Sequence, residues 1–176
     1  MSLMFVLATA VIPFMAIAVS AALYPGFSLY SNALSDLGHS LRSPSAPIFN
    51  SALTISSFLL AIQAVIYVWE VDHLLSINLL VTAFFLQLVA VFNEAYGIRF
   101  GNIHFVVSAL FFVALEFFLI SYSFRIKKKW GLIASIVIVI VWTMHFVINE
   151  PPGAAIPELI SVALFLIAYA DLVLRH

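Results

Sequence analysis

Six long apolar runs constrain this chain more than any other feature of its sequence. Each run is about 20 residues long, and its apolar residues follow one another continuously. About 20 apolar residues in a helix cross the hydrocarbon of a bilayer, where the backbone must satisfy its own hydrogen bonds. A barrel strand would be about half as long and would alternate in polarity. The runs therefore predict transmembrane helices and not a barrel.

Composition leads to the same class of protein and excludes others. The chain is 65% hydrophobic and 9% charged, whereas soluble domains average about 45–50% and about 25%. Its net charge of −1 gives no basic surface for a nucleic-acid partner. The absence of cysteine excludes disulfides, thiolate metal sites and a cysteine nucleophile. We expect an integral membrane protein.

The expected fold is all-α, a polytopic membrane protein with six transmembrane helices in one bundle, forming a single domain over 1–176. "YPG" at 24–26 breaks the first helix, "PSAP" at 44–47 precedes the second, and "NEPPG" at 149–153 closes the fifth, because two adjacent prolines cannot continue a helix interior. The first run lacks a basic leader and is too long for a signal peptide, so we expect a retained span. The spans are expected at about 3–23, 48–69, 74–93, 103–124, 130–148 and 156–174.

Orientation in the membrane follows from the Lys and Arg residues of short loops. "RIKKK" at 125–129 and Arg175 lie on one side of the expected bundle, whereas Arg42 and Arg99 lie on the other. Cytoplasmic loops carry the excess of basic residues. We therefore expect a multi-pass protein of the cell membrane with both termini in the cytoplasm and the connections 24–47, 94–102 and 149–155 facing outward.

Polar side chains are concentrated in the outward connections and the adjoining helix ends. We expect them to surround one outward-facing pocket that binds a ligand. The candidate pocket residues are Ser35, Asp36, His39, Asn50, Glu94, His104, His145, Asn149, Glu150 and Glu158.

Two interpretations of these residues stay open. The Asn-Glu pairs ending in Glu94 and Glu150 either cap helices or provide two facing carboxylates for a cation or a shared proton. His104 and His145 either hydrogen-bond neighbouring helices or ligate a divalent metal such as zinc together with Asp36 and Glu150. Dense ligand spacing such as HExxH is absent from the sequence, so the cofactor is left open.

Two further features carry alternatives of their own. "SDLGH" at 35–39 predicts a turn or a short re-entrant helix, with Ser35 or Asp36 as a cap, whereas a serine nucleophile would need a base that this segment does not fix. Glu116 is a carboxylate inside an apolar span. Such a group is costly in lipid and points into the bundle, either as a neutral structural residue bonded to Gln63, Gln87 or Tyr122, or as a proton relay.

The segment "YSNALSDLGHSLRSPSAPIFNSAL", followed by "NEAYG" and "GNIH", resembles the prokaryotic membrane family known as domain of unknown function 998. More distantly, the chain is similar to the six-helix DRAM and Sfk-like family. The resemblance implies the six-helix fold but no activity. It also implies a functional face at Ser35, Asp36, Gly38, Asn50, Glu94 and His104.

The expected function is an integral membrane protein whose outward pocket binds a lipid or another small ligand. One alternative is a membrane-embedded hydrolase, with or without a metal, acting on a lipid or lipid-linked substrate. Another is a small transporter, for which Glu116 would extend a path from the pocket toward the cytoplasm. Membrane lipids are the expected partners, and a second copy or a partner subunit remains open.

Overall fold

The computed structural model describes residues 3–96 and 101–175, so Gly97 of the "NEAYG" motif and Arg99 of the charge count lie outside the described residues. The secondary structure that it describes is helical. Within those two ranges, six helices are long and apolar enough to cross a membrane. The all-α class with six membrane-spanning helices is confirmed.

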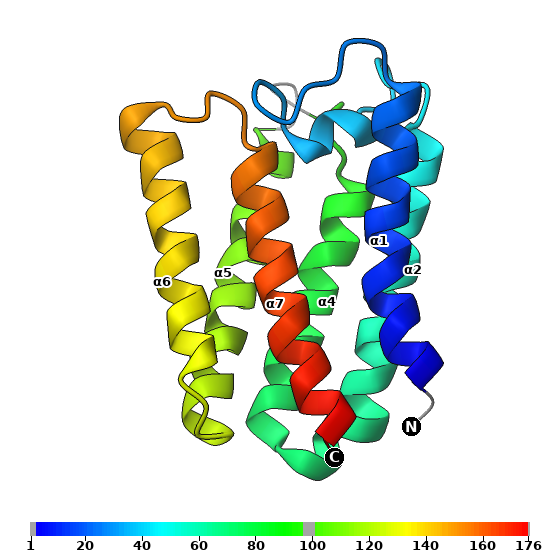
Figure 1. Ribbon diagram of the computed structural model, residues 1–176. Coiled ribbons are helices and arrows are strands. Elements are labelled where there is room, and N and C mark those ends of the chain that lie inside the picture. Colours follow the sequence, from blue (N-terminus) through cyan, green and yellow to red (C-terminus); the bar gives the residue numbers. More distant parts are fainter. Residues whose placement is uncertain (1–2, 97–100, 176) are drawn as a thin grey trace.

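The six long helices run alternately up and down, and both chain ends lie at the same end of the bundle (Figure 1). The opposite end, here called the mouth end, carries the connection 24–45, the described residues 92–96 and 101–102 of the second connection, and the connection 149–154. A π-helical turn, η2 (Ala64–Val68), and α3 (Trp69–Val71) prolong the second helix, and a π-helical turn, η4 (Met144–Ile148), prolongs the fifth. The long helices are α1 (Leu3–Leu23), α2 (Ala46–Gln63), α4 (His73–Val91), α5 (Ile103–Arg125), α6 (Trp130–Thr143) and α7 (Ala155–Arg175).

At the end of the bundle that carries both chain termini, here called the terminal end, a one-residue link shows how the sequence sets the helix boundaries. Asp72 is the only residue between α3 and α4, and its Oδ1 accepts a hydrogen bond from the Leu75 amide at 3.0 Å. Side chains at this position satisfy an amide that the first helical turn leaves unpaired. The Arg125 Nε atom donates to Asp72 Oδ2 at 2.6 Å, so the same carboxylate joins the end of α5 to the start of α4.

The first connection folds onto the bundle instead of projecting from it. Its 3₁₀ helix, η1 (Leu34–Gly38), places Leu37 in a fully buried position against Phe49 and Leu34. Burial of such side chains stabilises the contact by about 1.5–3 kcal/mol each. The first connection, with η1, therefore packs over the mouth end of the bundle.

The link between α6 and α7 packs against the first connection by close backbone contact. The Gly153 amide donates to the Tyr30 carbonyl at 3.0 Å, and the Ala155 amide donates to the Asn32 carbonyl at 2.9 Å. A Cβ atom at Gly153 would lie 2.4 Å from the Asn32 carbonyl oxygen, so only glycine permits this approach. The first and third connections are thereby held together over the mouth end.

Candidate functional site

Three of the expected pocket residues hold η1 in place. Glu158 Oε2 accepts a hydrogen bond from the Leu34 amide at 2.6 Å, and Asp36 Oδ2 accepts one from the Ala33 amide at 3.0 Å. At the other end of η1, Asn50 Nδ2 donates to the Gly38 carbonyl at 2.9 Å. These contacts cap both ends of the 3₁₀ helix from α7, from η1 itself and from α2. The capping interpretation of Asp36 therefore has a direct structural basis.

Glu94 lies against Asp36, and the two carboxyl groups interact. Burial raises the pKa of Glu94 to about 7, and the hydrogen bond and charge of the Asp36 carboxyl add to this effect while the Arg42 guanidinium opposes it. The Oε2 atom of Glu94 is buried without a hydrogen-bond partner among the described residues. Two carboxyl groups this close share a proton more readily than they both ionise. The carboxyl pair at the mouth end is thus Glu94 with Asp36, and not Glu94 with Glu150.

His104 is oriented by the end of the preceding helix. Its Nδ1 atom lies 2.7 Å from the carbonyl oxygen of Phe92, the residue that ends α4. A carbonyl oxygen only accepts hydrogen bonds, so Nδ1 carries a proton. In the neutral ring Nε2 is then an acceptor, and it lies 3.5 Å from the Ser108 hydroxyl, one helical turn further along α5.

The candidate residues in and next to the third connection form hydrogen bonds or backbone turns within the loops of the mouth end. Glu150 Oε2 accepts a hydrogen bond from the Tyr30 hydroxyl at 2.6 Å, and this bond raises the pKa of Tyr30. His145 Nδ1 lies 2.8 Å from the Pro151 carbonyl oxygen. Asn149 is exposed and ends η4 in the left-handed conformation, with φ of 59°. Of these three side chains, only His145 lines one of the two spaces that are described below.

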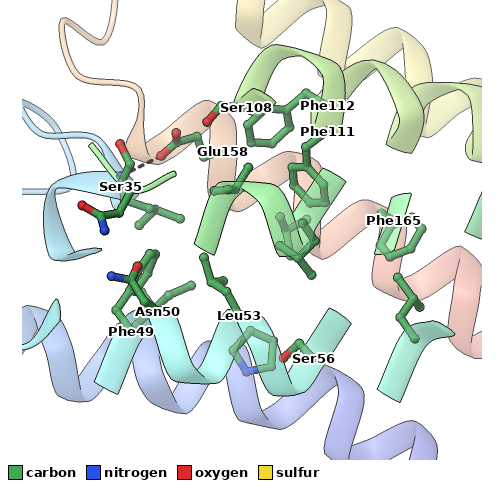
Figure 2. Close-up of a pocket in the computed structure, with 18 of the residues that line it drawn as sticks. Ser35, Phe49, Asn50, Leu53, Ser56, Ser108, Phe111, Phe112, Glu158 and Phe165 are labelled. Atoms are coloured by element: carbon green, nitrogen blue, oxygen red, sulfur yellow. Dashed lines mark hydrogen bonds between the residues drawn. The ribbon is translucent and has the colours of Figure 1, made fainter. Parts of the chain in front are cut away.

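A partly enclosed cavity of about 100 Å³ lies beneath the mouth end, between α1, α2, α4, α5 and α7. Figure 2 shows Ser108 beside Glu158, with Ser35 from η1 facing them and Phe111 and Phe112 along the α5 side. We call this space the inner cavity. The polar residues that line it are Thr9, Ser35, Asn50, Ser56, Asn93, His104, Ser108 and Glu158.

A larger open groove of about 1340 Å³ runs along α5 and α6 from the mouth end, and we call it the lateral groove. Its wall at membrane depth is mainly apolar, apart from Glu116 and Ser135, and includes Val113, Phe117 and Val139, which are 49%, 62% and 57% exposed. At the mouth end its lining is polar. The polar and charged residues there are Ser35, His39, Arg42, Glu94, Asn102, His104, Ser108, His145 and Glu158.

The expected single pocket is thus divided into two spaces, which share five lining residues: Ser35, His104, Ser108, Phe112 and Glu158. We call these five the shared wall. Beyond it, His39, Glu94 and His145 line the groove alone, and Asn50 lines the cavity alone. Asp36, Asn149 and Glu150 line neither space.

The four candidate metal ligands are engaged separately. Asp36 bonds within η1, His104 bonds Phe92, His145 bonds Pro151 and Glu150 bonds Tyr30. Over residues 3–96 and 101–175, no three His, Asp or Glu side chains are grouped as a metal ion would require. Zinc therefore remains a prediction from residue types, with no geometric support from the described residues.

Glu116 lines the lateral groove deep in the membrane-spanning part. Its Oε2 atom accepts a short hydrogen bond from the Ser135 hydroxyl of α6, while its Oε1 atom is buried without a partner among the described residues. Neither Gln63 nor Gln87 bonds it, because Gln63 bonds Thr9 and Tyr169, and Gln87 bonds Ser57. Glu116 therefore joins α5 to α6 along the groove.

Ser108 and Asn93 line the inner cavity but are missing from the expected pocket residues. The sequence does hold one signal for Ser108. It lies four residues after His104, and side chains at that spacing share a helix face. The position of Asn93 depends on the end of α4, which the sequence places only to within a few residues.

Comparison with known proteins gives a family but no function. The family model described as "Protein of unknown function (DUF998)" matches residues 7–175. No curated protein and no solved structure matches this chain. The match covers nearly the whole length and includes the "SDLGH", "NEAYG" and "GNIH" segments on which the resemblance rested. The chain therefore belongs to the DUF998 family of membrane proteins.

Proposed function

We propose that this protein binds a membrane lipid in the lateral groove, with the lipid headgroup at the mouth end and an acyl chain along α5 and α6. The observation that supports this most is the change of lining along one continuous groove. Its polar end carries Arg42 and His39, and its membrane-depth wall carries exposed apolar side chains such as Phe117. A lipid likewise has a polar headgroup at one end and apolar acyl chains at the other.

The size and the opening of the groove also favour a lipid. Pockets for drug-sized ligands occupy about 300–1,000 Å³, whereas this groove is about 1340 Å³. Its apolar wall is exposed on helices that cross the bilayer, so a lipid would enter sideways without leaving the membrane. The proposal also includes the orientation of the chain. With both termini in the cytoplasm, the mouth end would bind lipids of the outer leaflet.

A pair of matched substitutions on α6 tests the proposal. Val139 lines the groove and Ile136 does not, yet the two are 57% and 60% exposed. We expect V139W to fill the groove and lower the lipid that copurifies with the protein in mild detergent several-fold, as measured by lipid extraction and mass spectrometry. I136W should retain the lipid of the unchanged protein. Equal lipid content in both variants and the unchanged protein would contradict binding in the groove.

A further inference from the structure

The shared wall separates two spaces of different character. On one side lies the lateral groove, whose long wall is apolar and exposed. On the other lies the inner cavity, whose lining is mainly apolar. The shared wall also adjoins the polar mouth end of the groove, so a group on this wall can meet an apolar molecule along the groove and water at its polar end.

The inner cavity has a mainly apolar lining, with room for water next to one unsatisfied hydroxyl. Its volume of about 100 Å³ exceeds the roughly 10–15 Å³ that one water molecule needs on this measure. Ser56 lines it, is 3% exposed, and has a hydroxyl without a hydrogen-bond partner in the described part of the chain. Buried hydroxyl groups are normally hydrogen-bonded, so water in this cavity would satisfy Ser56.

The shared wall also contains a hydroxyl next to a base. The Phe92 carbonyl fixes the proton of His104 on Nδ1, at 2.7 Å, and the unprotonated Nε2 atom lies 3.5 Å from Ser108 Oγ. This is the order of a nucleophile, a general base and a group that orients the base. A Ser-His separation of this length is common before substrate binds and shortens in the complex.

Depth in the bilayer is consistent with a lipid ester as the reacting group. Ser108 is five residues into α5, which at 1.5 Å per residue is about 7 Å from the start of the helix. The ester bonds of a membrane lipid lie between its polar headgroup and its acyl chains. A lipid whose headgroup is at the polar end of the groove would therefore present an ester near the shared wall.

We propose that the shared wall is an esterase site that cleaves a carboxylic ester of the lipid in the groove, with Ser108 as nucleophile and His104 as general base. This inference rests on the proposed lipid binding. Ser108 Oγ forms a bond to the ester carbonyl carbon, and its proton passes to His104 Nε2. The bond from that carbon to the alkoxy oxygen breaks, and His104 returns the proton to the leaving alcohol. Water from the polar mouth end of the groove then attacks the acyl-serine with His104 as base, which releases the fatty acid and restores Ser108.

A fluorophosphonate with a long alkyl chain tests the nucleophile directly, because it phosphonylates an activated serine and loses fluoride. The protein in lipid nanodiscs would be treated with this probe, digested and analysed by mass spectrometry. We expect an adduct on Ser108 that is absent in S108A. H104Q should label at least tenfold more slowly, since a positioned base contributes about 10²–10⁴-fold. The control S121A removes a hydroxyl from the same helix that lines neither space and should label normally.

The outcomes separate this inference from lipid binding. Release of fatty acid from nanodisc lipids should follow the same order, with S108A and H104Q inactive and S121A active. If Ser108 carries no adduct, or if H104Q labels as fast as the unchanged protein, Ser108 only forms a local hydrogen bond and the esterase proposal is overturned. Copurified lipid in the unchanged protein decides the other question. If Ser108 carries no adduct but lipid copurifies, the esterase alone is overturned, whereas the absence of both overturns lipid binding as well.

Discussion

At the scale of single residues, the mouth end contains several carboxyl groups, and their neighbours determine what each one does. Glu158 accepts a hydrogen bond from a backbone amide, and Glu150 accepts one from a tyrosine hydroxyl. Glu94 instead lies against Asp36, which together with burial raises its pKa to about 7. The protonation of Glu94 therefore changes near neutral pH.

The Glu94 pair predicts a pH-dependent stability. The pKa of Glu94 is raised from 4.5 to about 7 in the folded protein, so its contribution is complete below about pH 4.5 and is lost as the pH rises through 7. Because Glu94 is only half-buried, we expect about 1 kcal/mol or less, or a fall of about 2–4 °C in Tm. Melting in detergent between pH 5 and 8 should show this fall in the unchanged protein and in E150Q, but less in E94Q. Equal slopes for E94Q and the unchanged protein would disprove the raised pKa of Glu94.

At the scale of elements, the position of α6 determines the width of the lateral groove. α6 has the smallest buried share of the six membrane-spanning helices in the described residues. It lies close to α5 at Gly131, where an added Cβ atom would lie 2.3 Å from the Leu119 carbonyl oxygen and 3.0 Å from Ser123 Cβ. Small residues permit such approach between membrane helices. Gly131 thus allows the start of α6 to pack close to α5.

An alanine at Gly131 should force α6 away from α5. We expect G131A to lower the free energy of unfolding by about 1–3 kcal/mol, the usual cost of overpacking, as measured by denaturant titration in detergent. The control I136A changes a side chain of the same helix that is 60% exposed, and it should stay within about 0.5 kcal/mol. The close approach would be refuted by a G131A protein as stable as I136A.

At the scale of the whole molecule, the basic residues predict which side of the membrane each end faces. Five Lys and Arg residues belong to the terminal end, and two belong to the connections at the mouth end. The structure places Ser40 and Lys129 at opposite ends of the bundle, and both are exposed. These two positions therefore report on the orientation of the whole chain.

Single cysteines test the orientation, because the chain contains none of its own. In intact cells an impermeant thiol reagent should label S40C and leave K129C unlabelled. Permeabilised cells should label both, which controls for accessibility. Labelling of K129C but not S40C in intact cells would reverse the predicted orientation, since the excess of basic residues would then lie outside.

The sequence by itself determined the number and class of the helices, because a backbone in lipid satisfies its hydrogen bonds only within a helix or a closed barrel. Proline and polar residues also marked where those helices end, as at "YPG" and "NEPPG". These are local effects, so they need no knowledge of the neighbours. The family resemblance, which rested on the connections at the mouth end, is confirmed over residues 7–175.

Only the tertiary structure decided which polar groups meet. Glu158 bonds the Leu34 amide across 124 residues of sequence, and Glu94 pairs with Asp36 and not with Glu150. Adjacent residues of a helix point about 100° apart, so the rotation of each helix selects the contacts. These helices are apolar on nearly every side, which removes the periodic pattern that would reveal their rotation. Packing of the helices, and of η1 over their ends, therefore divided the expected pocket into a groove and a cavity.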